Sequence, residues 1–245
     1  MKSDHNDIIE MFDTLKLPVA IGTFRDLLKD PELGHYNPVQ FLRELLTPQY
    51  LETLNNRYET NLRLSGLHDK SAKIENLKTG NGRIYNDVTV QQILSFSFAE
   101  ERLNVGVYGV TGAGKSYFLS ACCVEACRLN FRSKYIDYCD LLDELIMLNR
   151  KEDLMKYRKR LKYYAKFQLL FIDDFAISRY SEEGMNILYH LIKMRTDLGT
   201  STMFSSQYAP DEWGNYLSDE PKCYGKLDGI RRRLTTGFVV LIEKP

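Results

Sequence analysis

The sequence predicts an α/β fold, in which a five-stranded parallel sheet flanked by helices is preceded by a small all-helical N-terminal domain. From Val90 onward, short apolar runs alternate with stretches of helical spacing. This alternation is typical of βαβ units and of a parallel sheet covered on both faces. Before residue 80 the apolar residues keep helical spacing only. We therefore expect a helical domain and linker over residues 1–79 and the α/β domain over residues 80–245.

Composition limits the classes of protein that the chain can belong to. The 33 Lys and Arg residues balance 33 Asp and Glu residues, which excludes a uniformly basic surface but not a local basic patch. The five cysteines are odd in number and form no Cys-x-x-Cys pair, so neither a disulfide framework nor a zinc site is expected. No segment approaches 18 apolar residues, and the first ten residues contain no apolar run. We therefore expect no secretory signal, no membrane partner and a cytoplasmic location.

The N-terminal part carries two helix-start signals, at Asn37-Pro38 and at Thr47-Pro48. An apolar stripe of helical spacing follows each of them, which predicts three or four short helices. Pro48 either starts a new helix or kinks a longer one, and both alternatives stay open. The aromatic residues expected in this core are Tyr36, Phe41 and Tyr50.

The α/β part contains five apolar runs of strand length. They lie at residues 105–108, 134–137, 168–172, 202–204 and 238–242. Helical patterns fall between them, at residues 117–128, 139–148 and 182–195. The first of these helices contains three cysteines, which we expect to be buried as small apolar side chains.

Residues 109–116 fit the pattern G-x-x-x-x-G-K-[ST] and lie between an expected strand and an expected helix. Such a loop points its backbone N–H groups at phosphates, and the helix N-terminus adds its partial positive charge. We expect Lys115 to reach the β- and γ-phosphates of a nucleoside triphosphate and the Ser116 hydroxyl to ligate Mg²⁺. The alternative is a glycine-rich turn with an exposed lysine. The expected ATP-binding residues are Gly109, Val110, Thr111, Gly112, Ala113, Gly114, Lys115 and Ser116.

Two carboxylates end the apolar run that begins at Leu169. Because unpaired buried charge is costly, acids at the end of a buried strand are expected beside a metal ion. We assign Asp173 to Mg²⁺, directly or through water, and Asp174 to polarising the attacking water. The alternative is a solvated turn in which both acids cap the next helix.

With these residues the chain resembles AAA+ ATPases of the IstB/DnaC type over nearly its whole length, and IstB-like transposition helper proteins most closely. The matching segments are Leu17-Pro18, Phe41–Thr47, Asn55–Arg57, Asn104-Val105, Glu212–Gly214 and Arg233-Leu234. The resemblance implies an AAA+ ATPase with ATP and Mg²⁺ as cofactors and a homo-oligomer with shared ATP sites. It also implies double-stranded DNA and a transposase as partners.

The resemblance assigns roles to three further residues. Gln207 aligns with a polar sensor residue that is usually Asn in the family, and Asp174 stands where the family commonly has Glu. Arg233 corresponds to an arginine finger that reaches into a neighbour's site and stabilises charge on the transferred phosphoryl group. The alternatives for this segment are a solvated basic turn or arginines that touch DNA. The sequence stops at Pro245, directly after the last expected strand, so no C-terminal helical lid is expected.

The segment from Arg150 to Lys166 holds eight basic and two acidic residues, with tyrosines interleaved. In a chain of zero net charge, such a concentration predicts sequence-tolerant contacts with a phosphate backbone. The alternative is a solvated helix face. The expected DNA-binding residues are Lys156, Arg158, Lys159, Arg160 and Lys162.

Three functions remain to be compared. The favoured one is an ATP-dependent assembly factor that holds DNA and presents it to a transposase. The second is a DnaC-type loader of a replicative helicase. The third is a P-loop kinase of a small molecule, which needs an acceptor pocket and often a mobile lid, and the sequence shows neither.

Overall fold

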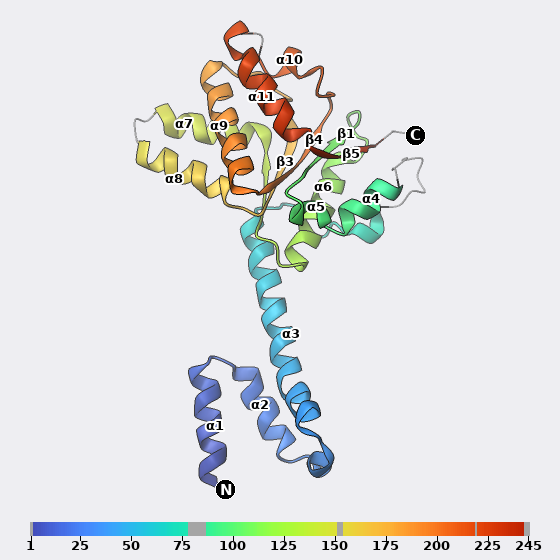
Figure 1. Cartoon of the computed structure of the whole chain (residues 1–245), viewed down its shortest axis with the longest axis vertical. Coiled ribbons are helices and arrows are strands. Elements are labelled where there is room, and N and C mark those ends of the chain that lie inside the picture. Colours follow the sequence, from blue (N-terminus) through green and yellow to red (C-terminus); the bar gives the residue numbers. More distant parts are fainter. Residues whose placement is uncertain (1, 78–86, 151–153, 219, 243–245) are drawn as a thin grey trace. The chain divides into compact units, whose positions relative to one another are not determined.

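The computed structural model describes residues 2–77, 87–150, 154–218 and 220–242 (Figure 1). The chain forms two compact units, Met1–Thr60 and Asn61–Pro245. The division falls within helix α3, Pro38–Ser65. The boundary expected between residues 79 and 80 lies outside the described residues.

The first unit is helical, as predicted. It contains α1 (Lys2–Thr14), α2 (Pro18–Leu27), a 3₁₀ helix (Pro31–His35) and most of α3. Pro18 occupies the first turn of α2, where its missing N–H leaves no partner unsatisfied. The side chain of Gln49 on α3 accepts hydrogen bonds from the N–H groups of Val19 and Ala20 at 3.0 and 3.2 Å. Gln49 therefore serves as the cap of α2.

Helix α3 continues through Pro48, so this proline lies inside one long helix and does not start a second one. The core of the first unit is formed by Phe24, Leu27 and Leu45, and Tyr36 and Phe41 pack against it as predicted. The expectation for Tyr50 is wrong, because this side chain is 62% exposed. Tyr50 fits the helical spacing of the apolar residues in the sequence, but its side chain does not face α1 or α2.

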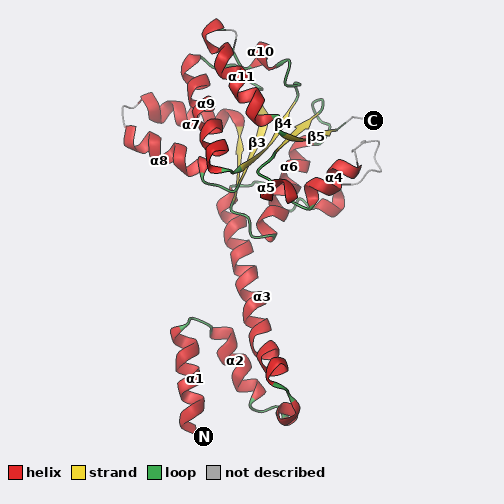
Figure 2. Cartoon of the chain, in the orientation of Figure 1, coloured by secondary structure: helices red, strands yellow, loops and turns green. Residues whose placement is uncertain are grey.

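The second unit alternates strands and helices (Figure 2). Short helices precede the sheet: a 3₁₀ helix (Ile74–Asn76), α4 (Asp87–Leu94) and α5 (Ser97–Glu100). The strands are β1 (Asn104–Tyr108), β2 (Ser133–Asp137), β3 (Leu169–Phe175), β4 (Ser201–Ser206) and β5 (Gly237–Leu241). The helices among them are α6 (Lys115–Arg128), α7 (Tyr138–Arg150), α8 (Leu154–Ala165), α9 (Glu182–Leu198), α10 (Trp213–Tyr216), a 3₁₀ helix (Pro221–Cys223) and α11 (Tyr224–Leu234).

The five strands form one parallel sheet in the order β2-β3-β4-β1-β5, which confirms the predicted sheet. Strands β1 and β4 are buried along their whole length, which explains why they appear in the sequence as continuous apolar or small-residue runs. Because all strands are parallel, the loops that follow them gather at one edge of the sheet. The P-loop, Asp173 and Gln207 all belong to this edge.

Helices cover both faces of the sheet (Figure 1). Helix α6 packs against β1, β2, β3 and β4, and its cysteines Cys122, Cys123 and Cys127 are buried free thiols, as predicted. Helices α7, α9 and α11 cover the other face, where Leu170, Ile172 and Phe204 join their core. Within the described residues, no helix is long and apolar enough to cross a membrane.

One charged side chain, Arg195 on α9, lies within this core and is 1% exposed. Its guanidinium donates hydrogen bonds to carbonyl groups at the end of α8, in the following turn and at the start of β4. It also donates one to a threonine hydroxyl. The acceptors are the backbone oxygens of Tyr164, Ala165, Phe167 and Ser201 and the Oγ1 atom of Thr202. Burial lowers the pKa of Arg195 to about 9, so the side chain stays protonated at neutral pH.

Candidate functional site

The P-loop joins the end of β1 to the start of α6. A Cβ atom at Gly109 would lie 2.3 Å from the carbonyl oxygen of Ile242, so only glycine fits beside the end of β5. Gly114, with φ of +103°, is the N-cap of α6 and adopts a backbone conformation that other residues rarely take. The helix N-terminus, with its unpaired N–H groups, therefore stands at the carboxyl edge of the sheet.

Lys115 is folded back onto this loop. Its side chain is buried, and Nζ donates a hydrogen bond to the carbonyl oxygen of Val110 at 3.1 Å. Burial lowers the pKa of Lys115, while the carboxylates of Asp174 and Asp173 oppose the shift. The ammonium group thus lies within electrostatic reach of both acids.

Asp173 receives hydrogen bonds from three elements. The hydroxyl of Ser116 on α6 donates to Oδ1 at 3.2 Å, and the hydroxyl of Ser205 on β4 donates to the same atom. The hydroxyl of Tyr135 on β2 donates to Oδ2 at 2.6 Å. Both carboxylate oxygens are therefore engaged, and the orientation of the side chain is fixed.

Asp174 adopts a left-handed backbone conformation with φ of +49°. Its N–H group donates to Oδ1 of Asp173 at 3.1 Å and to Oγ of Ser205 at 2.9 Å. Burial raises the pKa of Asp174, the charge of Asp173 adds to this effect, and Lys115 opposes it. A carboxyl group with a raised pKa beside a cationic loop is a candidate general base.

Gln207 directly follows β4, which neighbours β1 in the sheet. Its Oε1 atom accepts a hydrogen bond of 2.7 Å from Oγ1 of Thr111 in the P-loop. The structure therefore brings the P-loop, Asp173, Asp174 and Gln207 to one place.

Arg233 lies on α11 and is half-buried. Its Nη1 atom donates to the carbonyl oxygen of Gly229 at 2.8 Å, and the guanidinium stands 5.3 Å from the centre of the Tyr189 ring. Neither of these contacts involves the P-loop or Asp173. In its own chain, the Arg233 guanidinium thus contacts Gly229 and Tyr189 and not the candidate ATP site.

The basic segment is helix α8 from Leu154 onward, and residues 151–153 lie outside the described residues. Lys156, Arg158, Lys159 and Lys162 are exposed. Arg160 differs, because its Nε atom lies 2.7 Å from Oε1 of Glu144 on α7, and its guanidinium stands over the rings of Tyr163 and Tyr164. The charge of Arg160 is thus already paired within the protein.

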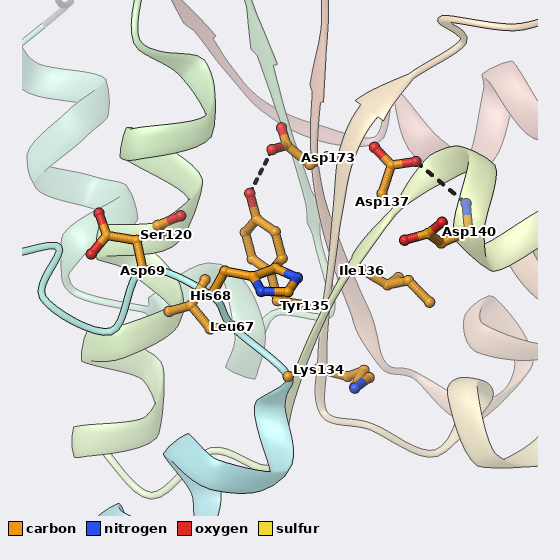
Figure 3. A pocket seen from close by; sticks show the side chains of 11 residues that line it. Leu67, His68, Asp69, Ser120, Lys134, Tyr135, Ile136, Asp137, Asp140 and Asp173 are labelled. Carbon is orange, nitrogen blue, oxygen red and sulfur yellow. Dashed lines mark hydrogen bonds between the residues drawn. The ribbon is translucent and has the colours of Figure 1, made fainter.

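Sequence reasoning missed Tyr135, which lies in the wall of a cavity of about 460 Å³ beside Asp173 (Figure 3). The cavity lies between residues 66–69, α6 and β2, and Asp69, Asp137 and Asp140 also line it. Asp137 accepts a hydrogen bond from the N–H group of Cys139 at 2.7 Å and so caps α7. In the sequence Tyr135 is one residue of an apolar run, and nothing there signals its contact with Asp173.

Comparison with known families gives a match to one family model, described as IstB-like ATP binding protein, over residues 11–234. A protein of Geobacillus stearothermophilus, named as an ATP-binding protein of insertion sequence IS5376, is 22% identical over 91% of this chain and 87% of its own length. A protein of Bacillus thuringiensis subsp. berliner, named as an ATP-binding protein of insertion sequence IS232, is 26% identical over 62% of this chain. That match spans 61% of the Bacillus protein.

Solved structures share the fold of the second unit. AMPPCP-bound DnaA from Aquifex aeolicus aligns with a TM-score of 0.57 and 20% identity over 73% of this chain and 51% of that one. The DnaC helicase loader aligns with a TM-score of 0.52 and 18% identity over 63% of this chain and 86% of that one. At these identities the likeness establishes the fold alone, which is the AAA+ fold that the resemblance implied.

Proposed function

The chain belongs to the family of IstB-like ATP-binding proteins, and from this premise we propose that it is an ATPase that assembles on DNA and presents it to a transposase. The observation that carries the proposal is the convergence of the P-loop, Asp173, Asp174 and Gln207 at one edge of the sheet. The names of the relatives, which refer to insertion sequences, support the connection with transposition.

The residues present fit a bound Mg²⁺–nucleotide complex. Ser116 Oγ and Asp173 Oδ1, which lie 3.2 Å apart, are the oxygen ligands that Mg²⁺ prefers. In the described part of the chain, no three His, Cys, Asp or Glu side chains are arranged to hold a metal alone. An ion at this site would be held by one carboxylate, one hydroxyl, phosphate oxygens and water. When bound, Mg²⁺ would neutralise charge on the β- and γ-phosphates.

We assign nucleotide binding to the loop from Gly109 to Ser116. Its backbone N–H groups and the N-terminus of α6 hold the phosphates, and Lys115 leaves the carbonyl of Val110 to reach them. The buried ammonium gains a phosphate in place of a neutral carbonyl, so the interaction becomes charge-assisted.

For hydrolysis, we assign Asp174 to the attacking water. Its raised pKa makes it a better proton acceptor than an ordinary aspartate. Gln207, next to the P-loop, orients the water or the γ-phosphate by its side-chain amide. We assign Asp173 to holding Mg²⁺ through its carboxylate.

The charge that develops on the transferred phosphoryl group still needs a cation, and we assign this role to Arg233 of a neighbouring subunit. Within its own chain Arg233 is held by Gly229 and Tyr189. A neighbour's phosphates offer a stronger partner than a carbonyl and an aromatic ring. We therefore propose a homo-oligomer in which each ATP site is shared between two subunits.

The exposed lysines and arginine of α8 are the proposed contact with double-stranded DNA. Phosphates carry no sequence information, so this binding is sequence-tolerant. A cytoplasmic location remains our expectation, with all five cysteines present as free thiols. The DnaC-type helicase loader is the second candidate, favoured by the shared fold.

The central experiment compares the wild-type protein with Lys115→Ala. We expect the variant to bind a fluorescent ATP analogue at least about tenfold more weakly, which corresponds to roughly 1.4 kcal/mol. We also expect it to lose ATP-dependent binding to duplex DNA and any stimulation of strand transfer by a transposase encoded beside it. Unchanged ATP affinity in a folded variant would exclude the P-loop as the binding site. Stimulation of a replicative helicase instead of a transposase would favour the loader.

A further inference from the structure

Tyr135 and Asp173 lie on neighbouring parallel strands and on the same face of the sheet. The register of β2 and β3 pairs Tyr135 with Phe171 and Asp137 with Asp173. Because side chains alternate along a strand, Asp173 projects on the same side as Phe171, next to Tyr135 along the diagonal. A tyrosine is long enough to reach this position, and its hydroxyl ends 2.6 Å from Oδ2 of Asp173 (Figure 3).

The carboxylate is held from both sides. Tyr135 on β2 binds Oδ2, and Ser205 on β4 donates to Oδ1. The hydroxyl of Ser116 then reaches Oδ1 at 3.2 Å. Without Tyr135, Oδ2 would lose its donor beside the adjoining cavity of about 460 Å³, and only the bonds to Oδ1 would orient the carboxylate.

Burial and the neighbouring charge of Asp173 raise the pKa of Tyr135. The phenol hydroxyl is the donor in its hydrogen bond with the Asp173 carboxylate. A short hydrogen bond from a side chain on the neighbouring strand is suited to holding a carboxylate in one orientation. Groups that orient metal ligands in this way typically change metal affinity or activity by about 10–100-fold when they are lost.

We propose that Tyr135 is a positioning residue that fixes the Asp173 carboxylate in the orientation required to hold the Mg²⁺ of the nucleotide complex. The inference rests on the proposed Mg²⁺–ATP site and adds to it a residue outside the P-loop and the acidic strand. Tyr135 touches neither nucleotide nor metal in this assignment and acts only through Asp173.

The test is Tyr135→Phe, which keeps the ring and removes the hydroxyl. ADP affinity is measured by calorimetry with Mg²⁺ and with EDTA, and the ratio of the two constants gives the gain due to the metal. We expect the EDTA affinity to stay within about twofold of wild type and the metal gain to fall about tenfold or more. Tyr138→Phe is the matched control, because the buried Tyr138 hydroxyl has no hydrogen-bond partner among the described residues. This control should keep the full metal gain.

A second comparison separates positioning from a general loss of structure. In an Asp173→Asn background, Tyr135→Phe should have no further effect on the metal gain, because the two residues act in series. Melting temperatures of all variants are measured alongside. A full metal gain in Tyr135→Phe, beside a clear gain in wild type, overturns the role of Tyr135 and leaves the proposed function intact. If wild-type affinity itself does not depend on Mg²⁺, the proposed metal site is wrong and the inference falls with it.

Discussion

Thr111 in the P-loop donates a hydrogen bond of 2.7 Å to the side-chain oxygen of Gln207. The two residues are 96 positions apart in the chain and meet because β4 neighbours β1 in the sheet. The shorter Asn that is usual in the family has one methylene less with which to reach this hydroxyl. The bond thus ties the nucleotide loop to the residue that we assign to the γ-phosphate.

We predict that Gln207→Ala keeps ATP affinity and lowers the turnover number by about 10²-fold, the effect of losing a transition-state hydrogen bond. Thr111→Ala is the matched variant, because it breaks the same bond and leaves the glutamine amide in place. Steady-state ATPase assays should show a change of at most about threefold for Thr111→Ala. Equal losses in both variants would mean that Gln207 only holds the loop.

Arg233→Ala is expected to bind ATP normally and to lose about 10³-fold or more in hydrolysis, because the finger acts only on the transferred group. Mixing it with Asp174→Asn protein should restore part of the activity, since mixed interfaces regain one intact site. Arg232→Ala, on the same helix with its side chain exposed, is the control and should hydrolyse ATP as wild type does. Wild-type rates in Arg233→Ala and no complementation would exclude a shared site that depends on this arginine.

Replacing basic residues of α8 by acidic ones should weaken DNA binding. It should also make the DNA affinity less dependent on salt concentration. For Arg158→Glu with Lys159→Glu, two lost phosphate contacts reduce the slope of log affinity against log salt by about 1.8 per subunit. Fluorescence anisotropy on unrelated duplexes measures both quantities. Lys193→Glu with Lys222→Glu changes net charge equally on other elements and should leave the slope unaltered. Matching curves for the two double variants would show that α8 is only a solvated face.

Asp174→Asn should be more stable than wild type at neutral pH. The raised pKa of Asp174 means that the folded state favours the protonated form, so ionisation above that pKa costs stability. Asn removes this cost and also tolerates the left-handed backbone. A gain of about 1 kcal/mol would raise Tm by about 2–4 °C in a chain of this size. The difference should shrink as pH falls from the raised pKa of Asp174 towards the ordinary pKa of aspartate and vanish below the latter, and a constant difference across pH would contradict the assigned cause.

Arg195→Met should lower the free energy of unfolding by at least about 3 kcal/mol, because it strands several buried carbonyl groups that accepted charged hydrogen bonds. Arg195→Lys keeps the charge but lacks the planar fork, so it should also destabilise the protein. Urea denaturation followed by circular dichroism gives both values. A methionine variant within about 0.5 kcal/mol of wild type would show that the carbonyls find other partners.

The sequence was sufficient to predict the parallel sheet, and with it the edge at which most of the candidate site residues meet. Each expected strand begins within one residue of an observed one, and the largest difference is at β3, which ends three residues later than expected. The P-loop and Gln207 follow strands, and Asp173 lies in the carboxyl-terminal half of β3, so a parallel arrangement alone predicts that they share one edge. Their detailed roles stay predictions, to be tested as described above.

Contacts that depend on strand order or on helix pairing could not be predicted. Tyr135 meets Asp173 because β2 neighbours β3, and a single sequence does not reveal strand order. From the sequence, Arg160 was predicted to bind DNA together with the basic residues around it. In the structure it forms an ion pair with Glu144, and this pair depends on how α7 packs against α8. Trp213 carried part of the family resemblance, and the structure shows that it is a core residue whose indole donates to the carbonyl of Tyr208 at 3.1 Å.

The closeness of Gly109 to Ile242 connects the segment after β5 to the nucleotide loop. The N–H group of Ile242 donates to the carbonyl of Tyr108 at 2.8 Å, and its own carbonyl occupies the space that a side chain at position 109 would need. The end of β5 is therefore part of the wall behind the nucleotide loop. A substitution that displaces the backbone at Ile242 is therefore expected to disturb the nucleotide loop from behind.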